Sequence, residues 1–323
     1  MADKLLEVRH LKQHIKLSGS WLSKPRYLYA VDDISFTLTP GETLGLVGES
    51  GCGKSTLARS ILKLIEPTSG QIVFQGQDIT HFSAKQMMPL RKDIQIIFQD
   101  PMDSLNARHT VGAILEEPYV IHQMGDATQR REWVIALLQK VGLPVDAIDK
   151  YPHEFSGGQK QRIGIARAIA LKPKVIVCDE AVSALDMSVQ AQIMNLLLTL
   201  QQEMQLALIF IAHDLSVVKH ISDRVAVMYL GKIVELTSAE RLYREPLHPY
   251  TQALMSAIPV ADPRQRRKRF VIQGDVPSPI APPSGCYFSS RCPSVMAKCK
   301  QLAPELSPAT SLAEHLIACH LID

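Results

Sequence analysis

The sequence contains a glycine-rich segment whose residue types and spacing suit the binding of phosphate groups. An expected strand at 41–47 precedes it, an expected helix begins at Lys54, and the segment reads Gly48-Glu49-Ser50-Gly51-Cys52-Gly53-Lys54-Ser55. This G-x-x-x-x-G-K-S pattern lets backbone N–H groups close around phosphate oxygens at the positive end of a helix. We expect Lys54 to reach the β- and γ-phosphates of a nucleotide, Ser55 to bind Mg²⁺, and the nucleotide-contacting residues to extend to Thr56.

Two adjacent carboxylates follow an apolar segment further along the chain. Val175–Cys178 is apolar throughout, and Asp179 and Glu180 come directly after it. An Asp at the end of such a strand can hold Mg²⁺ through water, and the next Glu can polarise an attacking water as a general base. A solvated strand end is the alternative interpretation. A phosphate loop in the same chain favours the catalytic one.

The elements that must position these groups alternate between short strands and helices. Strands are expected at 4–9, 30–38, 41–47, 71–74, 94–98, 175–178 and 206–212, and helical segments at 54–64, 110–147, 159–171 and 188–204. Short apolar strands that alternate with helices are typical of an α/β fold with a parallel sheet covered on both faces. Beyond Ile258 frequent prolines replace this periodicity. We therefore expect one domain at 1–260 and a second at 261–323.

Composition sets limits on the class of protein. The chain has 323 residues, 46% hydrophobic residues and a net charge of +3. That charge is too small to require a nucleic-acid partner. The first residues lack a secretory signal, and the longest apolar runs fall far short of the roughly 20 residues that a membrane-spanning helix needs. We therefore expect a chain that does not span a bilayer and works in a reducing compartment.

A further motif lies directly upstream of the strand that ends in the two carboxylates. It reads Phe155-Ser156-Gly157-Gly158-Gln159-Lys160-Gln161-Arg162, and by itself it could be a helix cap followed by a turn. In this order and spacing it resembles the signature motif of ATP-binding-cassette proteins, usually written LSGGQ, with Phe155 in place of Leu. The resemblance implies roles for three more residues: Gln99 as the Q-loop glutamine that contacts Mg²⁺ and signals to a permease, Asp186 as the D-loop aspartate, and His213 as the switch histidine that contacts the γ-phosphate.

The resemblance also implies a fold and a mechanism. The expected fold is a P-loop cassette with a parallel sheet core, an antiparallel β subdomain and a helical subdomain, plus a small C-terminal Cys-bearing domain. In this family the signature residues of one cassette, here Ser156, Gly157, Gly158 and Gln159, cap the ATP held by the phosphate loop of another. Hydrolysis then opens the dimer and moves the transmembrane subunits. One chain carries one cassette, so a second one is required.

Finer features resemble the F-type ATP-binding subunit of bacterial oligopeptide and dipeptide importers over nearly the whole chain. They include the segments 99–101, 104–106, 116–118, 151–153, 213–218, 248–254, 277–279, 285–286 and 291–293. The resemblance implies a heterodimer with a second homologous ATPase, two permease subunits, an extracytoplasmic substrate-binding protein, and a peripheral position at the cytoplasmic face of the inner membrane. Nickel importers share this architecture, so another small solute is the alternative to peptides.

The chain departs from the family pattern in two places. Ala181 follows Glu180 where the family usually has Pro; this removes a rigid φ angle but no catalytic group. The family usually stacks an aromatic ring on adenine at a position near Ile15, which is not aromatic. Trp21, Tyr27 and Tyr29 are the candidates, and we favour Tyr27 or Tyr29.

Two functions of other classes compete with transport. A soluble cassette ATPase acting on nucleic acid would use the basic run Arg264–Arg269, although we favour a solvated linker as the explanation of that run, with contact to acidic lipid or nucleic acid as the alternative. Against that function, the family's soluble members normally carry two cassettes or long insertions. A nucleotide sensor without turnover is the third candidate. Glu180 and His213, both present, argue against it.

The last prediction concerns four cysteines crowded near the C-terminus. Cys286, Cys292, Cys299 and Cys319 have the spacing C-x5-C-x6-C-x19-C. A reducing compartment argues against disulfides, and structural zinc sites typically have ligand pairs two to four residues apart, which are absent here. We expect a [4Fe–4S] cluster, whose cysteine spacings are more varied. Zinc and unliganded thiols remain the alternatives.

Overall fold

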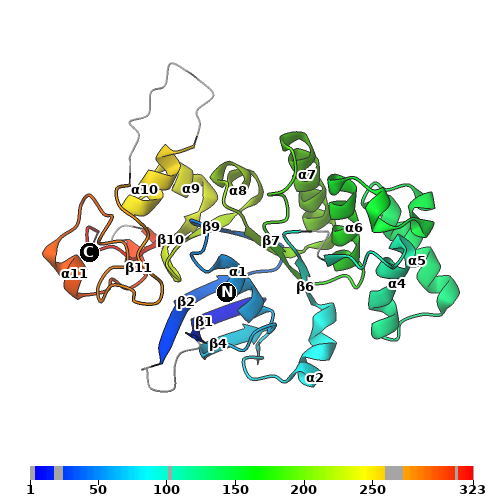
Figure 1. Cartoon of the computed structure of the whole chain (residues 1–323), viewed down its shortest axis with the longest axis horizontal. Helices are drawn as coiled ribbons and strands as arrows, with labels where there is room; N and C mark the ends of the chain where they lie inside the picture. The colour runs from blue at the N-terminus through cyan, green and yellow to red at the C-terminus, as the bar shows by residue number, and fades with distance from the viewer. Residues whose placement is uncertain (1–3, 18–24, 101–103, 259–271, 310–311, 323) are drawn as a thin grey trace, which may run out of the picture. The chain divides into compact units, whose positions relative to one another are not determined.

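The computed structural model describes residues 4–17, 25–100, 104–258, 272–309 and 312–322, and within them the chain forms two compact units. The first unit combines residues 1–39, 43–81 and 212–323, and the second combines 40–42 and 82–211. Both contain strands and helices in the mixture that the sequence predicted (Figure 1).

The first unit holds an antiparallel sheet in the strand order β2-β1-β4-β5. Its strands are β1 (Leu6–Leu17), β2 (Arg26–Leu38), β4 (Ser69–Phe74) and β5 (Gln77–Asp78). The first two are longer than the sequence predicted, because β1 continues through register shifts between Val8 and His14 that interrupt its alternation of buried and exposed side chains. This sheet is the expected antiparallel β subdomain.

The same unit holds a second group of strands in the order β11-β12-β10-β9-β3. They are β3 (Thr43–Val47), β9 (Arg224–Tyr229), β10 (Lys232–Ser238), β11 (Ser307–Ala309) and β12 (Leu312–Ile317). Strand β3 runs parallel to β9, whereas β10 pairs antiparallel with both β9 and β12. The C-terminal region thus adds strands to the sheet that also carries β3.

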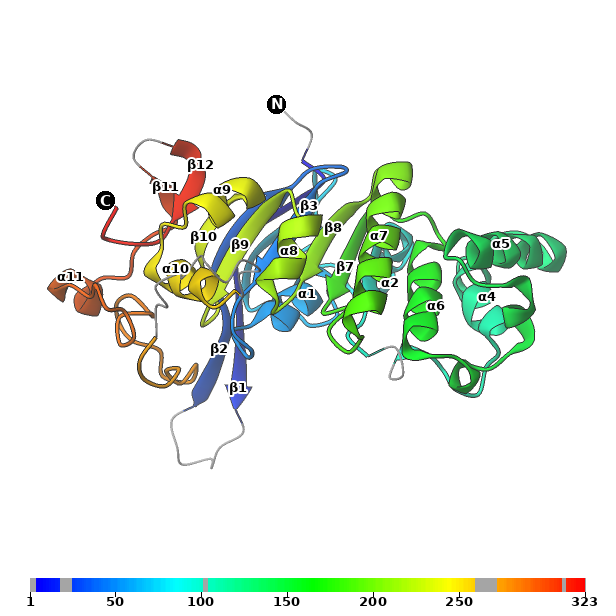
Figure 2. The same cartoon turned by 90° about the horizontal axis from the view of Figure 1, so that it is seen from above.

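The helices of the first unit are short. They are α1 (Lys54–Ile61), α8 (Leu215–Ile221), α9 (Ala239–Arg244), α10 (Pro249–Ser256) and α11 (Ala297–Gln301). In both views α9 and α10 lie beside β10 (Figures 1 and 2). The predicted boundary near residue 260 falls among residues 259–271, outside the described part of the chain, and stays a prediction.

The second unit has a parallel sheet in the order β8-β7-β6. Its strands are β6 (Ile94–Ile97), β7 (Val175–Asp179) and β8 (Ala207–Ile211), and every residue of β7 and β8 is buried. Its helices are α2 (Ala84–Met87), η1 (Met88–Lys92), α4 (Val111–Ile121), α5 (Ala127–Lys140), η2 (Val145–Asp149), η3 (Pro152–Glu154), α6 (Gly157–Ile169) and α7 (Met187–Met204). Figure 2 places α4, α5 and α6 together beyond the strands, as a helical subdomain.

Candidate functional site

The glycine-rich segment forms a tight loop between β3 and α1, where close backbone approach explains two of its glycines. A Cβ atom at Gly53 would lie 1.9 Å from the carbonyl oxygen of Ala30, and one at Gly48 would lie 2.2 Å from that of Met228. Real Cβ atoms do not come so close to a backbone oxygen, so only glycine fits at either position. The shape of the loop therefore depends on the backbone of β2 and β9 as well as on the loop residues.

Lys54 lies within this loop. Its side chain is buried, and its Nζ donates to the carbonyl oxygens of Gly48 at 2.8 Å and Glu49 at 3.1 Å. A Cβ atom at Gly51 would meet no atom within 4 Å, so the tip of the loop has free space around it. The loop therefore combines a held cation, a helix N-terminus and an open approach for a phosphate chain.

His213 belongs to the same unit as the phosphate loop. It follows Ala212, whose backbone N–H donates to the carbonyl oxygen of Leu46 at 3.3 Å. Because Leu46 is two residues before Gly48, this hydrogen bond brings the exposed His213 to the end of β3 where the loop begins. The role of His213 as a switch histidine stays a prediction.

The second unit brings Gln99 and Glu180 together. Their strands β6 and β7 are parallel neighbours, with Ile97 opposite Cys178, so both residues follow the carboxyl ends of adjacent strands. The Gln99 Nε2 donates to the Glu180 Oε2 at 2.8 Å. Glu180 has a φ angle of 50°, which few side chains other than glycine adopt. The backbone strain is consistent with a carboxylate held in a set direction at a functional site.

Asp179 is the last residue of β7 and is only 3% exposed. The residues after Glu180 turn back at once, since the Ser183 N–H and hydroxyl both donate to the Glu180 carbonyl oxygen. Asp186 then caps α7 by accepting from the Val189 N–H at 2.9 Å. The two carboxylates thus lie at the same strand end, with the D-loop beginning directly behind them.

The signature motif begins helix α6. Ser156 is its N-cap, and with Gln159 it forms a reciprocal capping box: each side chain accepts a hydrogen bond from the other's backbone N–H. The helix-cap interpretation of the motif is therefore correct for the isolated chain. Both residues are nevertheless exposed, whereas Phe155 is buried as the usual Leu would be. The N-terminus of α6, with its two glycines, faces solvent.

A cavity of about 170 Å³ joins three of the predicted motifs within the second unit. Gln99 and Asp100 line it from the Q-loop, Gly157 and Lys160 from the signature helix, and Leu185 from the D-loop. Ala181, at the position where the family usually has Pro, also lines it and is buried. A pyrrolidine ring is therefore not needed to close this turn against the cavity.

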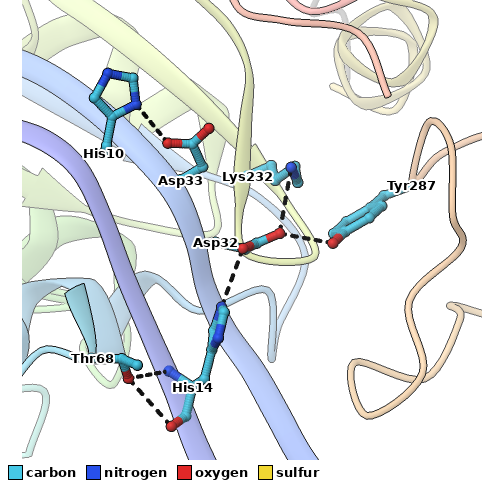
Figure 3. Close-up of polar contacts among 7 residues, drawn as sticks. All are labelled: His10, His14, Asp32, Asp33, Thr68, Lys232 and Tyr287. Atoms are coloured by element: carbon cyan, nitrogen blue, oxygen red, sulfur yellow. Dashed lines mark hydrogen bonds and ion pairs between the residues drawn. The ribbon is translucent and has the colours of Figure 1, made fainter. Parts of the chain in front are cut away.

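The expected adenine contact falls on β1 and β2. Tyr27 is 38% exposed, and the Tyr29 ring packs against His14 with a centroid distance of 4.5 Å. Figure 3 shows that His14 in turn contacts Asp32, which accepts from the Tyr287 hydroxyl at 2.8 Å. Trp21 lies outside the described residues. The role of Tyr27 or Tyr29 toward adenine stays a prediction.

The structure does not support the iron–sulfur cluster expected on the four C-terminal cysteines. The part of the chain that the structure describes contains no group of three or more His, Cys, Asp or Glu side chains arranged to hold a metal ion. Burial raises the pKa of the Cys286 thiol to about 11, and the charges of the other three cysteines add to this. A cluster would therefore have to stabilise a thiolate that burial disfavours.

Two contacts to the phosphate loop were not predicted from the sequence. The Tyr250 hydroxyl accepts the Glu49 N–H at 2.9 Å, and Arg291 forms an ion pair with the Glu49 side chain at 2.9 Å. Both partners are more than 200 residues from Glu49. Their segments, 248–254 and 291–293, carried only a family resemblance, which gave no indication of these contacts. The basic run Arg264–Arg269 lies outside the described residues.

The order and geometry of these groups define the class of protein: a P-loop ATPase of the ATP-binding-cassette type. Each group follows a strand or begins a helix, as this class requires. The groups are the phosphate loop with its buried Lys54, the Asp179–Glu180 pair, the signature helix and His213. None of the described helices is both long and apolar enough to cross a membrane.

Comparisons with known proteins agree with this class and narrow it. A family model described as ABC transporter matches residues 31–183, and one described as the C-terminal region of oligopeptide/dipeptide transporters matches residues 234–299. The oligopeptide transport ATP-binding protein AppF of Bacillus subtilis is 52% identical over 323 residues, covering 99% of this chain and 98% of its own. The protein OppF of Haemophilus influenzae, of the same description, is 53% identical over 321 residues, covering 98% and 96%.

Solved structures share the cassette fold. One is cbiO1 from Clostridium perfringens, part of the ABC transporter complex cbiONQ, with a TM-score of 0.65 and 30% identity over 75% of this chain and 92% of its own. Another is an ATP-binding cassette dimer in a post-hydrolysis state with ADP and Pi, with a TM-score of 0.65 and 25% identity over 72% and 98%. This chain belongs to the oligopeptide transport ATP-binding proteins of the ABC transporter family.

Proposed function

We propose that this chain hydrolyses ATP to drive the import of peptides through a membrane permease. The observation that carries the proposal is the likeness to oligopeptide transport ATP-binding proteins, which extends over both the cassette and the C-terminal region. A likeness limited to the cassette would leave the transported solute open, because cassettes power many kinds of transport. The cassette therefore supports ATP hydrolysis, and the likeness in the C-terminal region supports peptides as the transported substrate.

In the chemical step, each residue has a role that its surroundings support. Lys54 and the N–H groups of its loop bind the β- and γ-phosphates, and Ser55, Gln99 and Asp179 are the oxygen-bearing side chains suited to Mg²⁺, which would offset phosphate charge. Glu180 is the general base, and the hydrogen bond from the Gln99 amide orients its carboxylate. His213 contacts the γ-phosphate from the end of β3.

The signature motif supports a partner cassette. Ser156, Gly157 and Gln159 are exposed at the N-terminus of α6, where a helix dipole and free backbone N–H groups suit the phosphates of a nucleotide held by another chain. Because this chain carries one signature and one phosphate loop, we propose a heterodimer with a second homologous ATPase. Two permease subunits and an extracytoplasmic binding protein complete the transporter, and the chain is attached to the cytoplasmic face of the inner membrane through the permeases.

The [4Fe–4S] cluster stays a separate proposal that rests on the spacing of the four cysteines. The described residues hold no group of three or more ligands arranged for a metal ion, and burial disfavours the Cys286 thiolate, so the thiols would have to ionise and rearrange around the cluster. The role would be structural or redox-sensing, because the cysteines lie outside the nucleotide motifs. No step of ATP hydrolysis depends on it.

Reconstitution of the whole transporter tests the function. The transporter is reconstituted in proteoliposomes from this chain, the second homologous ATPase, the permeases and the binding protein. ATP is supplied on the side of the membrane that the ATPases face. We expect labelled oligopeptide to accumulate and ATPase activity to rise with peptide-loaded binding protein, whereas this chain purified alone hydrolyses ATP poorly. Uptake of nickel in place of peptide would contradict the substrate class, and full activity of a monomeric preparation would contradict the pairing.

A further inference from the structure

The second residue of the phosphate loop carries a negative charge where the anionic phosphates of a nucleotide are expected to bind. Glu49 follows Gly48 directly, and its side chain is 29% exposed. The phosphate chain of ATP carries several negative charges, so an uncompensated carboxylate in the loop would repel it. A cation held beside this carboxylate would offset its charge.

Arg291 is that cation. Its Nη1 donates to the Glu49 Oε2 at 2.9 Å and its Nη2 donates to the Glu49 Oε1 at 3.2 Å, so two parallel hydrogen bonds join the guanidinium to the carboxylate. Such a fork fixes direction as well as distance. The Arg291 side chain is only 9% exposed, which limits screening of the pair by solvent and salt.

The Arg291 side chain is itself well supported. It contacts the Tyr229 hydroxyl at 3.4 Å, and its guanidinium lies 5.9 Å from the centre of the Tyr229 ring. Burial alone would lower the pKa of Arg291, but the hydrogen bonds to Glu49 and Tyr229 outweigh it and raise the pKa. The side chain is therefore a cation throughout the range in which the protein works.

The backbone of Glu49 is held from the same direction. Its N–H donates to the hydroxyl of Tyr250, a fully buried side chain on α10. The Tyr250 ring packs on Tyr229 at 4.8 Å and on Phe288 at 5.4 Å, between ring centroids. Phe288 is three residues before Arg291, so one short segment of the C-terminal region supports both the side chain and the backbone of Glu49.

A second contact anchors that segment to the same unit. Figure 3 shows Tyr287 reaching from the C-terminal loop to Asp32, which also contacts Lys232 at 3.4 Å. Burial raises the pKa of Asp32, but the Tyr287 hydrogen bond and the Lys232 charge outweigh it, and the pKa lies below the usual value for Asp. Asp32 is thus an ionised anchor, and Arg291 reaches Glu49 from a segment fastened at Tyr287 and Phe288.

We propose that Arg291 is a positioning residue of the nucleotide site: it holds and neutralises Glu49, so that the phosphate loop binds ATP at full affinity only when the C-terminal region is folded against it. The inference rests on the proposed nucleotide site at Gly48–Ser55. It assigns to a segment outside the cassette motifs an indirect part in ATP binding. Arg291 touches the loop and not the nucleotide, so it acts through Glu49.

The test is a double-mutant cycle on the full-length chain, with the dissociation constant for ATP measured by titration calorimetry. Arg291→Gln is expected to weaken ATP binding about tenfold, the equivalent of ~1.4 kcal/mol. Glu49→Gln should weaken it less, because that change leaves no unpaired carboxylate. The double variant should regain most of the affinity lost in Arg291→Gln. ADP, with fewer charges, should show a smaller loss than ATP.

Controls separate charge from folding. Arg130→Gln breaks an ion pair of similar length with Glu116 on the helical subdomain and should leave ATP binding unchanged. Circular dichroism checks the fold of each variant. If Arg291→Gln does not fold, Arg291→Lys, which keeps the charge but loses the fork, should show an intermediate loss that Glu49→Gln again reduces.

Two results would overturn the inference: ATP affinity of Arg291→Gln within twofold of the wild-type value, or a double variant that binds as weakly as Arg291→Gln. Both leave the proposed nucleotide site intact as long as the wild-type chain binds ATP. Failure of the wild-type chain to bind ATP would instead contradict the proposed site itself.

Discussion

Acid should destabilise the first unit through one buried histidine. His248 is the N-cap of α10: its Nδ1 accepts the Tyr250 N–H at 3.1 Å, and its backbone N–H donates to the Glu235 Oε2 at 2.9 Å. The side chain is 1% exposed. Burial lowers the pKa of His248 from 6.5 to about 4, although the charge of Glu235 opposes the shift. An Nδ1 atom that must accept cannot also carry a proton, so protonation would break the cap.

The size of the effect follows from the difference between the two pKa values. A fall from 6.5 to about 4 is ~2.5 units, or ~3 kcal/mol at ~1.36 kcal/mol a unit. In the unfolded chain His248 is protonated below pH 6.5, whereas in the folded chain it stays neutral down to about pH 4. The contribution to the free energy of unfolding is therefore complete above pH 6.5 and is lost as the pH falls toward 4. At ~2–4 °C for each kcal/mol, the melting temperature should drop by up to ~10 °C.

Thermal unfolding at pH 7 and pH 4.5, followed by circular dichroism, measures this drop. The matched variant is His248→Asn, which keeps a capping acceptor but does not titrate. Carboxylates elsewhere titrate in both proteins and cancel in the comparison. We expect the variant to lose clearly less melting temperature between the two pH values than the wild-type chain. Equal losses in both proteins would refute the reasoning.

Three further predictions concern the nucleotide site and the cysteines. Lys54→Ala removes the buried ammonium of the phosphate loop and should abolish ATP binding in calorimetry; an unchanged affinity would argue against the loop as the phosphate site. Glu180→Gln should keep ATP binding but slow hydrolysis in the assembled transporter by ~10²–10⁴-fold, and a rate within twofold of wild type would exclude Glu180 as the base. Anaerobic expression with iron should yield a brown protein absorbing near ~400 nm, whereas a colourless protein without iron and sulfide would eliminate the cluster.

Local chemistry explains which features could be predicted from the sequence. The phosphate loop, the strand before Asp179 and the cap at Ser156 depend on neighbours within a few residues, so their composition is enough to recognise them. The structure confirms the expected α/β fold with a parallel sheet, an antiparallel sheet and a helical subdomain. The roles of Glu180 and His213 stay predictions.

Long-range contacts explain what could not be predicted. The pairing of Arg291 with Glu49 joins residues 242 positions apart, and no local pattern marks either of them as a partner. Strand β11 contains a proline and β12 has only six residues, so no long alternation marks either of them; β12 pairs with the edge of β10, and β11 with β12. The cysteine spacing was visible, but the arrangement of the thiols depends on how the whole segment folds.

The pairing of β12 with β10 has a consequence for anyone who wishes to produce the cassette alone. Glu235 and Leu236 of β10 pair with Ile317 and Leu316, and the Ala318 N–H donates to the Val234 carbonyl oxygen at 2.9 Å. A fragment ending at residue 260 would leave the backbone edge of β10 unpaired. It would also expose Glu235, whose Oε1 now lies 2.7 Å from the Nε2 of His315. Bare strand edges recruit other chains. Such a fragment is therefore a poor candidate for crystallisation or drug screening, and expression vectors should carry the chain to its last strand.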